Sequence, residues 1–125
     1  LVLTSNPGAN DFEKLQLKDG RFLYQNILQS VDEWNQNSNC GIVFGATNPD
    51  ELRTNLNNFG SLSVLLPGVG AQGGSLEFVS KTFKENNRKN YLVNVSRGII
   101  YKSNGEDFAE AAGSEIISLN KITGA

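Results

Sequence analysis

The chain has 125 residues, of which 38% are hydrophobic and 19% are charged, and its net charge at pH 7 is −2. This length allows one domain at most, and the composition is typical of a folded globular protein, not of a disordered or membrane-spanning chain. The small net charge offers no basic surface for nucleic acid. Histidine is absent, which excludes Ser-His-Asp catalysis, and the single cysteine, Cys40, is compatible with a reducing, cytoplasmic location.

The first half of the chain predicts a strand end, a helix and a second strand. Residues 1–3 are apolar and indicate the end of a strand, which a turn and a loop up to residue 20 follow. Apolar residues at three- and four-residue spacing predict a helix over residues 21–36. The continuous apolar run at 41–46 predicts a strand covered on both faces. Thr47, Asn48 and Asp50 then indicate the capped start of a helix that ends near Gly60, rather than ligand contacts.

The second half of the chain repeats this order. A strand at 62–66 leads through a glycine-rich loop to a helix from Ser75 to Lys84, and a strand at 91–95 precedes a helix over 106–121. Four alternations of strand and helix predict right-handed βαβ units and a parallel sheet. In the last helix we expect one apolar face (Phe108, Ala112, Ile116 and Leu119) and one solvated acidic face (Asp107, Glu110 and Glu115).

The glycine-rich loop is the first candidate site. Residues 68–74 contain four glycines, and the predicted helix begins directly after them. Such a loop lets backbone N–H groups point outward beside a helix N-terminus, which predicts a phosphate site. Residues 68–73 also match the G-x-G-x-x-G dinucleotide pattern, but the next strand ends in Asn94, Val95 and Ser96, without the acid that would hold a ribose. A purely structural turn is the other alternative.

Arg97 is the second candidate. It follows the strand at 91–95 and lies between Ser96 and Gly98, so we expect it at the carboxyl edge where parallel sheets bind ligands. If the last two predicted strands close an eight-stranded α/β barrel, then Gln72, Gly73 and Arg97 converge on one phosphate. A surface ion pair is the alternative for Arg97.

A third strand end carries Thr4, Ser5 and Asn6. Their hydroxyl and amide groups could contact a ligand, and on the pattern alone a turn in which they bind their own backbone is an equally good interpretation. We do not expect Cys40 to act as a nucleophile, because the chain has no histidine to activate it.

Four motifs follow one another along the chain. They are Thr4-Ser5-Asn6-Pro7-Gly8, Val43-Phe44-Gly45-Ala46-Thr47, Leu66-Pro67-Gly68-Val69-Gly70-Ala71-Gln72-Gly73-Gly74 and Ser96-Arg97-Gly98-Ile99. In type and order they resemble the orotidine 5′-phosphate decarboxylase family, and most of all the subgroup with Thr-Ser-Asn-Pro and Pro-Gly-x-Gly-Ala-Gln-x-Gly loops. The resemblance implies a (β/α)8 TIM barrel, a homodimer, and decarboxylation of orotidine 5′-phosphate to UMP without metal or cofactor.

The resemblance also implies roles for individual residues. Ser5, with Thr4 beside it, matches the position that reads the edge of the pyrimidine, and Pro67 lines the base pocket. Gln72 and Arg97 match the residues that hold the 5′-phosphate. The substrate-binding residues expected on these grounds are Thr4, Ser5, Pro67, Gln72, Gly73, Ser96, Arg97 and Gly98.

One feature of the family has no counterpart here. The family's chemistry depends on an Asp-x-Lys-x-x-Asp array, which occurs nowhere in this chain. A full barrel needs about 250 residues, so the four units correspond to strands five to eight. We interpret residues 1–125 as the carboxyl-terminal half, with no catalytic residue of its own. We expect the N-terminal half as a further segment, as a second chain, or replaced by another copy of this half.

Two other functions fit the same residues. A non-catalytic nucleotide- or phosphate-binding module would bind UMP without decarboxylating its precursor. A related barrel enzyme acting on sugar phosphates would use the glycine-rich loop and Arg97, but a pyrimidine contact at Ser5 would then have no purpose.

Overall fold

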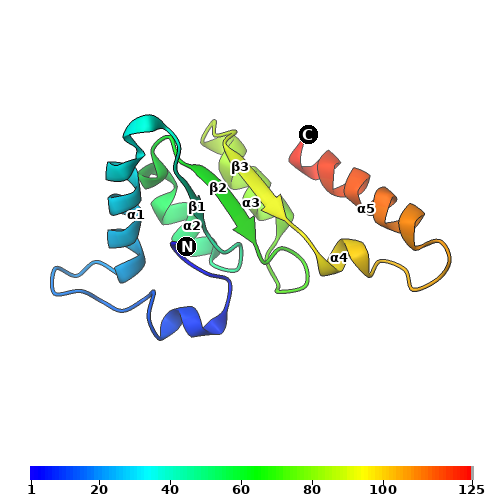
Figure 1. Cartoon of the computed structure of the whole chain (residues 1–125), viewed down its shortest axis with the longest axis horizontal. Coiled ribbons are helices and arrows are strands. Elements are labelled where there is room, and N and C mark those ends of the chain that lie inside the picture. The colour runs from blue at the N-terminus through cyan, green and yellow to red at the C-terminus, as the bar shows by residue number, and fades with distance from the viewer. Residues whose placement is uncertain (125) are drawn as a thin grey trace.

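The computed structural model describes residues 1–124, which form one parallel sheet with helices packed on it. The strands are β1 (Gly41–Val43), β2 (Ser63–Pro67) and β3 (Tyr91–Asn94), and they lie side by side in chain order, as Figure 1 shows. Both pairings are parallel. The predicted alternation of strand and helix and the predicted parallel sheet are therefore confirmed.

The first residues of the chain extend this sheet at its β1 edge. Leu3 forms a single parallel bridge with Phe44, and the backbone N–H of Gly45 donates to the Leu3 carbonyl at 2.7 Å. The strand predicted to end at residue 3 therefore occupies a fourth position beside β1. Because residues 4–6 follow directly, this pairing places them at the same edge of the sheet as the segments that follow β1, β2 and β3.

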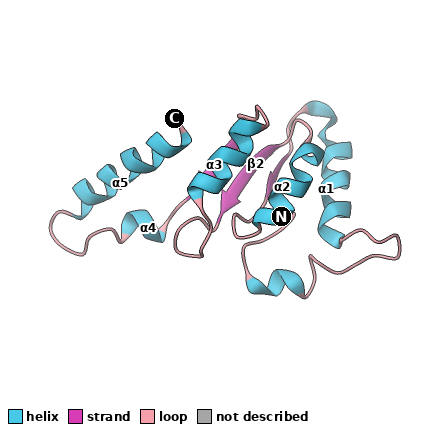
Figure 2. Ribbon diagram, turned by 180° about the vertical axis from the view of Figure 1, so that it is seen from behind, coloured by secondary structure: helices cyan, strands magenta, loops and turns pink. Residues whose placement is uncertain are grey.

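Within residues 1–124, five α-helices flank the sheet. Helices α1, α2 and α3 cover one face of it, which Figure 2 shows from the helix side. The helix α4 is a single short turn directly after β3, and α5 lies beyond the β3 edge of the sheet (Figure 1). The helices are α1 (Leu23–Trp34), α2 (Pro49–Asn55), α3 (Leu76–Glu85), α4 (Arg97–Ile100) and α5 (Phe108–Thr123), and 3-10 turns occupy Pro7–Asn10, Asn35–Asn37 and Leu56–Phe59.

The core lies between the sheet and these helices. Val64 and Leu66 of β2 are fully buried, and they meet aromatic and aliphatic side chains from the helical layer. Phe44 and Phe59 pack with ring centroids 5.2 Å apart. Removing such side chains from water supplies most of the stabilisation of the fold. This packing also holds the strand ends, which carry the candidate site, in a fixed arrangement.

The opposite face of the sheet is open within residues 1–124, whereas the apolar run at 41–46 by itself indicated a strand covered on both faces. Val43, Leu65 and Leu92 form one row across the three strands on that face. Leu65 is 40% exposed and Leu92 is 71% exposed. The apolar run at 41–46 therefore reflects burial on one face and an uncovered apolar surface on the other within residues 1–124.

Several helix boundaries differ from the prediction. The helix expected over 21–36 is α1, and a 3-10 turn takes its last residues. The helix expected to end near Gly60 is divided into α2 and the 3-10 turn Leu56–Phe59. Gly60 follows that turn with a φ of +52°. The short helix α4 was not predicted, because four residues carry no periodic pattern. These differences fall at element ends, where local sequence signals are weakest.

The helix α5 shows the predicted faces only in part. Leu119 is half-buried against the core, but Phe108 is 61% exposed and Ile116 is 44% exposed. Its carboxyl end is attached to α3, since the Ser80 hydroxyl donates to the Ile122 carbonyl at 3.0 Å. The amino-terminal turns of α5 therefore keep an apolar surface that residues 1–124 leave uncovered.

Candidate functional site

A cleft of about 390 Å³ opens at the carboxyl ends of the strands. Residues 4–6, the ends of β2 and β3 and the segments after them form its walls. Of the eight predicted substrate-binding residues, six line this cleft, and they come from segments far apart in the sequence. The six are Thr4, Ser5, Pro67, Gln72, Ser96 and Arg97.

The two predicted glycines lie beside the cleft and do not line it. Gly73 has a φ of +91° at the exposed turn of the glycine-rich loop, a conformation that favours glycine. Gly98 is half-buried in α4, where an added Cβ would approach Val95 Cγ1 at 3.3 Å. Both positions therefore shape the backbone next to the cleft, and their part in substrate binding stays a prediction.

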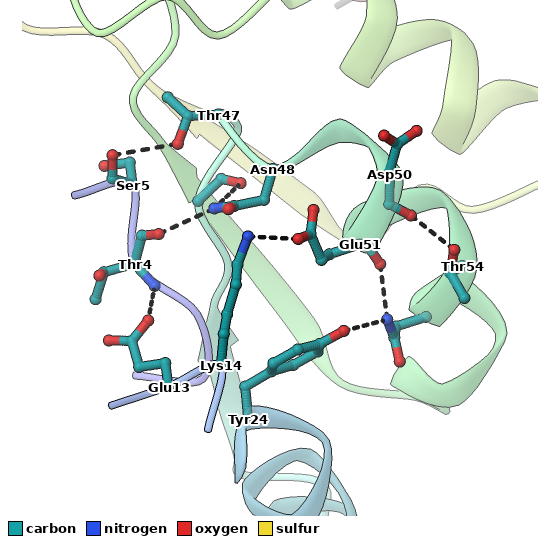
Figure 3. A network of polar contacts seen from close by, with 12 residues as sticks. Thr4, Ser5, Glu13, Lys14, Tyr24, Thr47, Asn48, Asp50, Glu51 and Thr54 are labelled. Carbon is teal, nitrogen blue, oxygen red and sulfur yellow. Dashed lines mark hydrogen bonds and ion pairs between the residues drawn. The ribbon is translucent and has the colours of Figure 1, made fainter. Parts of the chain in front are cut away.

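Side chains from other segments hold the Thr4–Ser5 backbone in place, as Figure 3 shows. The Thr4 N–H donates to the Glu13 carboxylate at 2.6 Å. The Asn48 amide donates to the Thr4 carbonyl at 2.9 Å, and the Thr47 hydroxyl donates to the Ser5 carbonyl at 3.2 Å. Neither Thr47 nor Asn48 caps α2 with its side chain, so the expectation of capping is wrong for both. The reason is that the Thr4 and Ser5 carbonyls offer them acceptors.

Further hydrogen bonds and an ion pair connect the 9–20 loop, α1 and α2 next to the Thr4–Ser5 segment. Lys14 forms an ion pair with Glu51 of α2, which connects the 9–20 loop to the helix. The Asn55 amide donates both to the Glu51 carbonyl at 2.9 Å and to the Tyr24 hydroxyl at 3.1 Å. Burial raises the pKa of Tyr24 above its ordinary value; the Asn55 hydrogen bond opposes this rise, and the nearby charge of Glu51 adds to it.

Ser5 and Gln72 meet across the cleft. The Ser5 hydroxyl donates to the Gln72 amide oxygen at 2.6 Å. Gly68 lies under this contact with a φ of +95°, and an added Cβ would come within 2.8 Å of Ser5 Cβ. Because that distance is too short for two carbon atoms, the contact requires glycine at position 68. The side chain expected to read the base therefore touches the one expected to hold the phosphate.

The glycine-rich loop is closed by its own hydrogen bonds. The N–H groups of Gly70, Gly73 and Gly74 donate to carbonyls within the loop, at 2.8–3.0 Å. At the start of α3 the Ser75 hydroxyl accepts from the Phe78 N–H at 3.1 Å. The prediction that the backbone N–H groups of the loop point outward is wrong for these three glycines, because the tight turn satisfies them internally. Side chains beside the loop offer further donors for an anion.

Arg97 is such a donor, and it begins α4 at the end of β3. The residue is exposed and lines the cleft, and within residues 1–124 no carboxylate forms an ion pair with it. The alternative of a surface ion pair is therefore excluded among these residues. The second donor is the Gln72 amide nitrogen, since the Gln72 oxygen already accepts from Ser5. A planar cation and an amide donor suit a phosphate group.

Asn94 and Val43 also line the cleft, although the motifs did not single them out as ligand contacts. Asn94 is the last residue of β3 and lies opposite Pro67 of β2 in the register. Its amide adds a polar group to the lining of the cleft. The signal available in the sequence was the alternation of β3, in which Asn94 shares the open face with Leu92.

In the part of the chain that the structure describes, no cluster of three or more acidic or cysteine side chains is arranged to bind a metal ion. No helix among the same residues combines the length and the apolar character needed to cross a membrane.

The comparisons with known proteins show to which family the chain belongs. The model of the orotidine 5′-phosphate decarboxylase / HUMPS family matches residues 1–112. The chain belongs to this family. It is 44% identical to an orotidine 5′-phosphate decarboxylase of Bordetella avium over 114 residues, and 44% identical to one of Herpetosiphon aurantiacus over 113 residues. Each match covers 90% of this chain, and 42% and 41% of the respective relative.

Solved structures of the family share the fold. The chain matches Leishmania donovani OMP decarboxylase with a TM-score of 0.74 and 32% identity, over 99% of this chain and 46% of that one. It matches Leishmania donovani UMP synthase with the same TM-score and 35% identity, over 96% of this chain and 26% of that one. The chain thus spans less than half the length of these relatives. The prediction that it is about half of a (β/α)8 barrel of this family is confirmed.

Proposed function

We propose that the protein to which this chain belongs is an orotidine 5′-phosphate decarboxylase. Such an enzyme is a carbon–carbon lyase that releases CO₂ from orotidine 5′-phosphate and leaves UMP, the last step in making that nucleotide. The observation that carries the proposal is the cleft, which places Ser5, Gln72 and Arg97 around one space at the carboxyl ends of the strands.

The cleft divides the substrate between two sets of groups. Arg97 and the Gln72 amide nitrogen are proposed to bind the 5′-phosphate, with Ser96 beside them. The Ser5 hydroxyl and the adjacent Thr4 are proposed to bind the polar edge of the pyrimidine, and Pro67 supplies an apolar wall for the ring. Phosphate and base would then be held on either side of the Ser5–Gln72 hydrogen bond.

This chain contributes binding energy and not the reacting groups. It has no Asp-x-Lys-x-x-Asp array, and we propose that this array comes from the N-terminal half of the barrel. Contacts to the phosphate and the base, remote from the carboxylate that leaves, orient the substrate in the transition state and so raise the rate. By the family resemblance, the reaction uses neither metal nor cofactor.

The open face of the sheet is where we propose that the N-terminal half packs. Leu65 and Leu92 are exposed there in one row, and closure of a barrel buries such a face on its inner side. Closure also pairs the free edge of β3, which would otherwise invite aggregation. By the same resemblance, the complete enzyme is proposed to be cytoplasmic and to form a homodimer. Light scattering of the purified protein tests whether it is a dimer.

The test is turnover by the intact protein that contains this chain. Incubated with orotidine 5′-phosphate, it is expected to form UMP and CO₂ in equal amounts, without added metal and in the presence of a chelator. Ribose 5-phosphate serves as a control ligand that carries the phosphate without the base. Tight UMP binding with no CO₂ release would contradict the enzyme and favour a non-catalytic binding module. Tight ribose 5-phosphate binding with no preference for UMP would favour a sugar-phosphate enzyme.

A further inference from the structure

Asn48 occupies the N-cap position of α2, yet its side chain points away from the helix. The residue is 8% exposed, and its amide nitrogen lies 2.9 Å from the Thr4 carbonyl and 3.4 Å from the Gly45 carbonyl. A capping side chain would instead accept a hydrogen bond from an N–H of the first turn of the helix. Asn48 therefore gives up the stabilisation of a cap and binds the backbone of a segment 44 positions earlier.

The backbone it binds carries the proposed base reader. The Thr47 hydroxyl donates to the Ser5 carbonyl at 3.2 Å, next to the Asn48 contact with the Thr4 carbonyl. Gly45 comes so close that an added Cβ would lie 2.6 Å from the Ser5 nitrogen. The two donors, Thr47 and Asn48, are seen in Figure 3. Together with the close approach of Gly45, they set where residues 4 and 5 lie.

The position of the Ser5 hydroxyl follows from this support. The hydroxyl extends one bond beyond Cβ, so a shift of the Thr4–Ser5 backbone moves it by a similar amount. It already donates to Gln72 at 2.6 Å, and hydrogen bonds weaken steeply when the geometry changes. Arg97 also lines the cleft, but it begins α4 and takes part in none of these contacts.

We propose that Asn48 is a positioning residue, assisted by Thr47, that sets the pyrimidine specificity of the cleft through the Thr4 carbonyl without touching the substrate. The proposal rests on the proposed function, because it assigns base recognition to Ser5. It makes a distinction that a general structural role does not: loss of Asn48 weakens binding of the base more than binding of the phosphate, because Ser5 contacts Gln72 but Arg97 remains to hold the phosphate.

The substitution Asn48→Asp tests this. It keeps the size of the side chain but sets a carboxylate against two carbonyl oxygens, so the support of the Thr4 backbone is lost. At an N-cap, aspartate is as good as asparagine, and its charge suits the helix N-terminus. Helix α2 should therefore be no less stable. Asn57→Asp is the matched control, because Asn57 lies exposed on the 3-10 turn after α2 and the charge change is the same.

The measurement compares two probes on the intact protein, UMP and ribose 5-phosphate. For Asn48→Asp we expect the UMP dissociation constant to rise about tenfold, the scale of one lost polar contact, and the ribose 5-phosphate constant to stay within about threefold. Asn57→Asp should change neither. Thr47→Val gives a second test if Asn48→Asp folds poorly, because it removes the hydroxyl that donates to the Ser5 carbonyl. Thr54→Val is its control, because it also removes one hydroxyl that donates to a backbone carbonyl. Only Thr47→Val should lose UMP affinity selectively.

Two outcomes overturn the inference while the proposed function stands. Either both probes weaken together in well-folded Asn48→Asp or Thr47→Val, or neither probe weakens in a protein that decarboxylates orotidine 5′-phosphate normally. If the unsubstituted intact protein neither binds UMP nor releases CO₂, the proposed function itself fails.

Discussion

The Ser5 hydroxyl donates a hydrogen bond of 2.6 Å to the Gln72 amide oxygen, across 67 positions of sequence. This contact joins the segment before η1 (Pro7–Asn10) to the loop after β2. It also orients Gln72, because an amide whose oxygen is engaged presents its nitrogen elsewhere. The residue proposed to bind the base and one of those proposed to bind the phosphate are therefore joined by a hydrogen bond before any ligand binds.

The connection predicts that Ser5→Ala and Gln72→Ala are not additive. For each variant of the intact protein, the change in kcat/KM is converted to a loss of transition-state binding free energy. The sum of the losses in the two single variants should exceed the loss in the double variant by about 1 kcal/mol, the scale of one hydrogen bond. A parallel cycle of Gln72→Ala with Thr54→Val, on the exposed side of α2, should be additive within about 0.5 kcal/mol. Additivity in both cycles would mean that the contact carries no energy in the complex.

Arg97 should have the largest single effect among the residues that line the cleft. Replacing it by alanine removes the cation that faces the phosphate, and a lost charge-assisted contact of this kind costs about 3 kcal/mol, or roughly a hundredfold in kcat/KM. Arg53→Ala is the control, since Arg53 is an exposed arginine of α2 that pairs with Asp50, and its loss should change kcat/KM little. An effect of Arg97→Ala below about threefold would remove its assignment as the phosphate ligand.

Gly45→Ala should damage the site and the fold together. The new Cβ would lie 2.6 Å from the Ser5 nitrogen and 2.7 Å from the Thr4 carbonyl carbon, so residues 4 and 5 must move. We expect the free energy of unfolding to fall by about 1–3 kcal/mol, with a parallel loss of UMP affinity. Gly113→Ala, which has open space around it within α5, should instead stabilise the protein by about 0.5–1 kcal/mol. Equal effects of the two substitutions on thermal unfolding would contradict this reading of Gly45.

Tyr24 should make the protein less stable at high pH. Burial raises its pKa in the folded state above the ordinary value of 10.0, so the unfolded chain loses this proton first as the pH rises. The contribution of Tyr24 to the free energy of unfolding is complete below about pH 10. It is lost as the pH rises through the folded-state pKa, and the free energy of unfolding then falls by at most about 1.4 kcal/mol per pH unit. Thermal unfolding between pH 8 and 11 checks this. Tyr24→Phe should show the weaker dependence, and equal slopes would contradict the prediction.

Much of the architecture could be predicted from the sequence. Apolar periodicity predicts α1, α3 and α5, and the predicted strand at 62–66 and the helix predicted from Ser75 agree with the structure within one or two residues. The motifs also named six of the residues that line the cleft. These successes share a cause, because periodicity, turn residues and short motifs are local properties that a stretch of chain keeps wherever it packs.

The errors share a cause as well. Asn48 was expected to cap α2, and local preference supports that expectation, but the Thr4 carbonyl offers a partner that only the folded chain brings near. The N–H groups of Gly70 and Gly73 were expected to face an anion, but they close their own turn. In each case a backbone or side-chain group had two satisfying partners, and packing selected between them.

The sequence by itself determined the alternation of strand and helix, the family to which the chain belongs, and the absence of the Asp-x-Lys-x-x-Asp array, since all three are written in the order of residues. Only the tertiary structure decided that Ser5 meets Gln72 and that Gly68 and Gly45 allow the approach. Those contacts join residues that are far apart in the chain. Which of them form depends on how the strands align and pack, and no local pattern encodes that alignment.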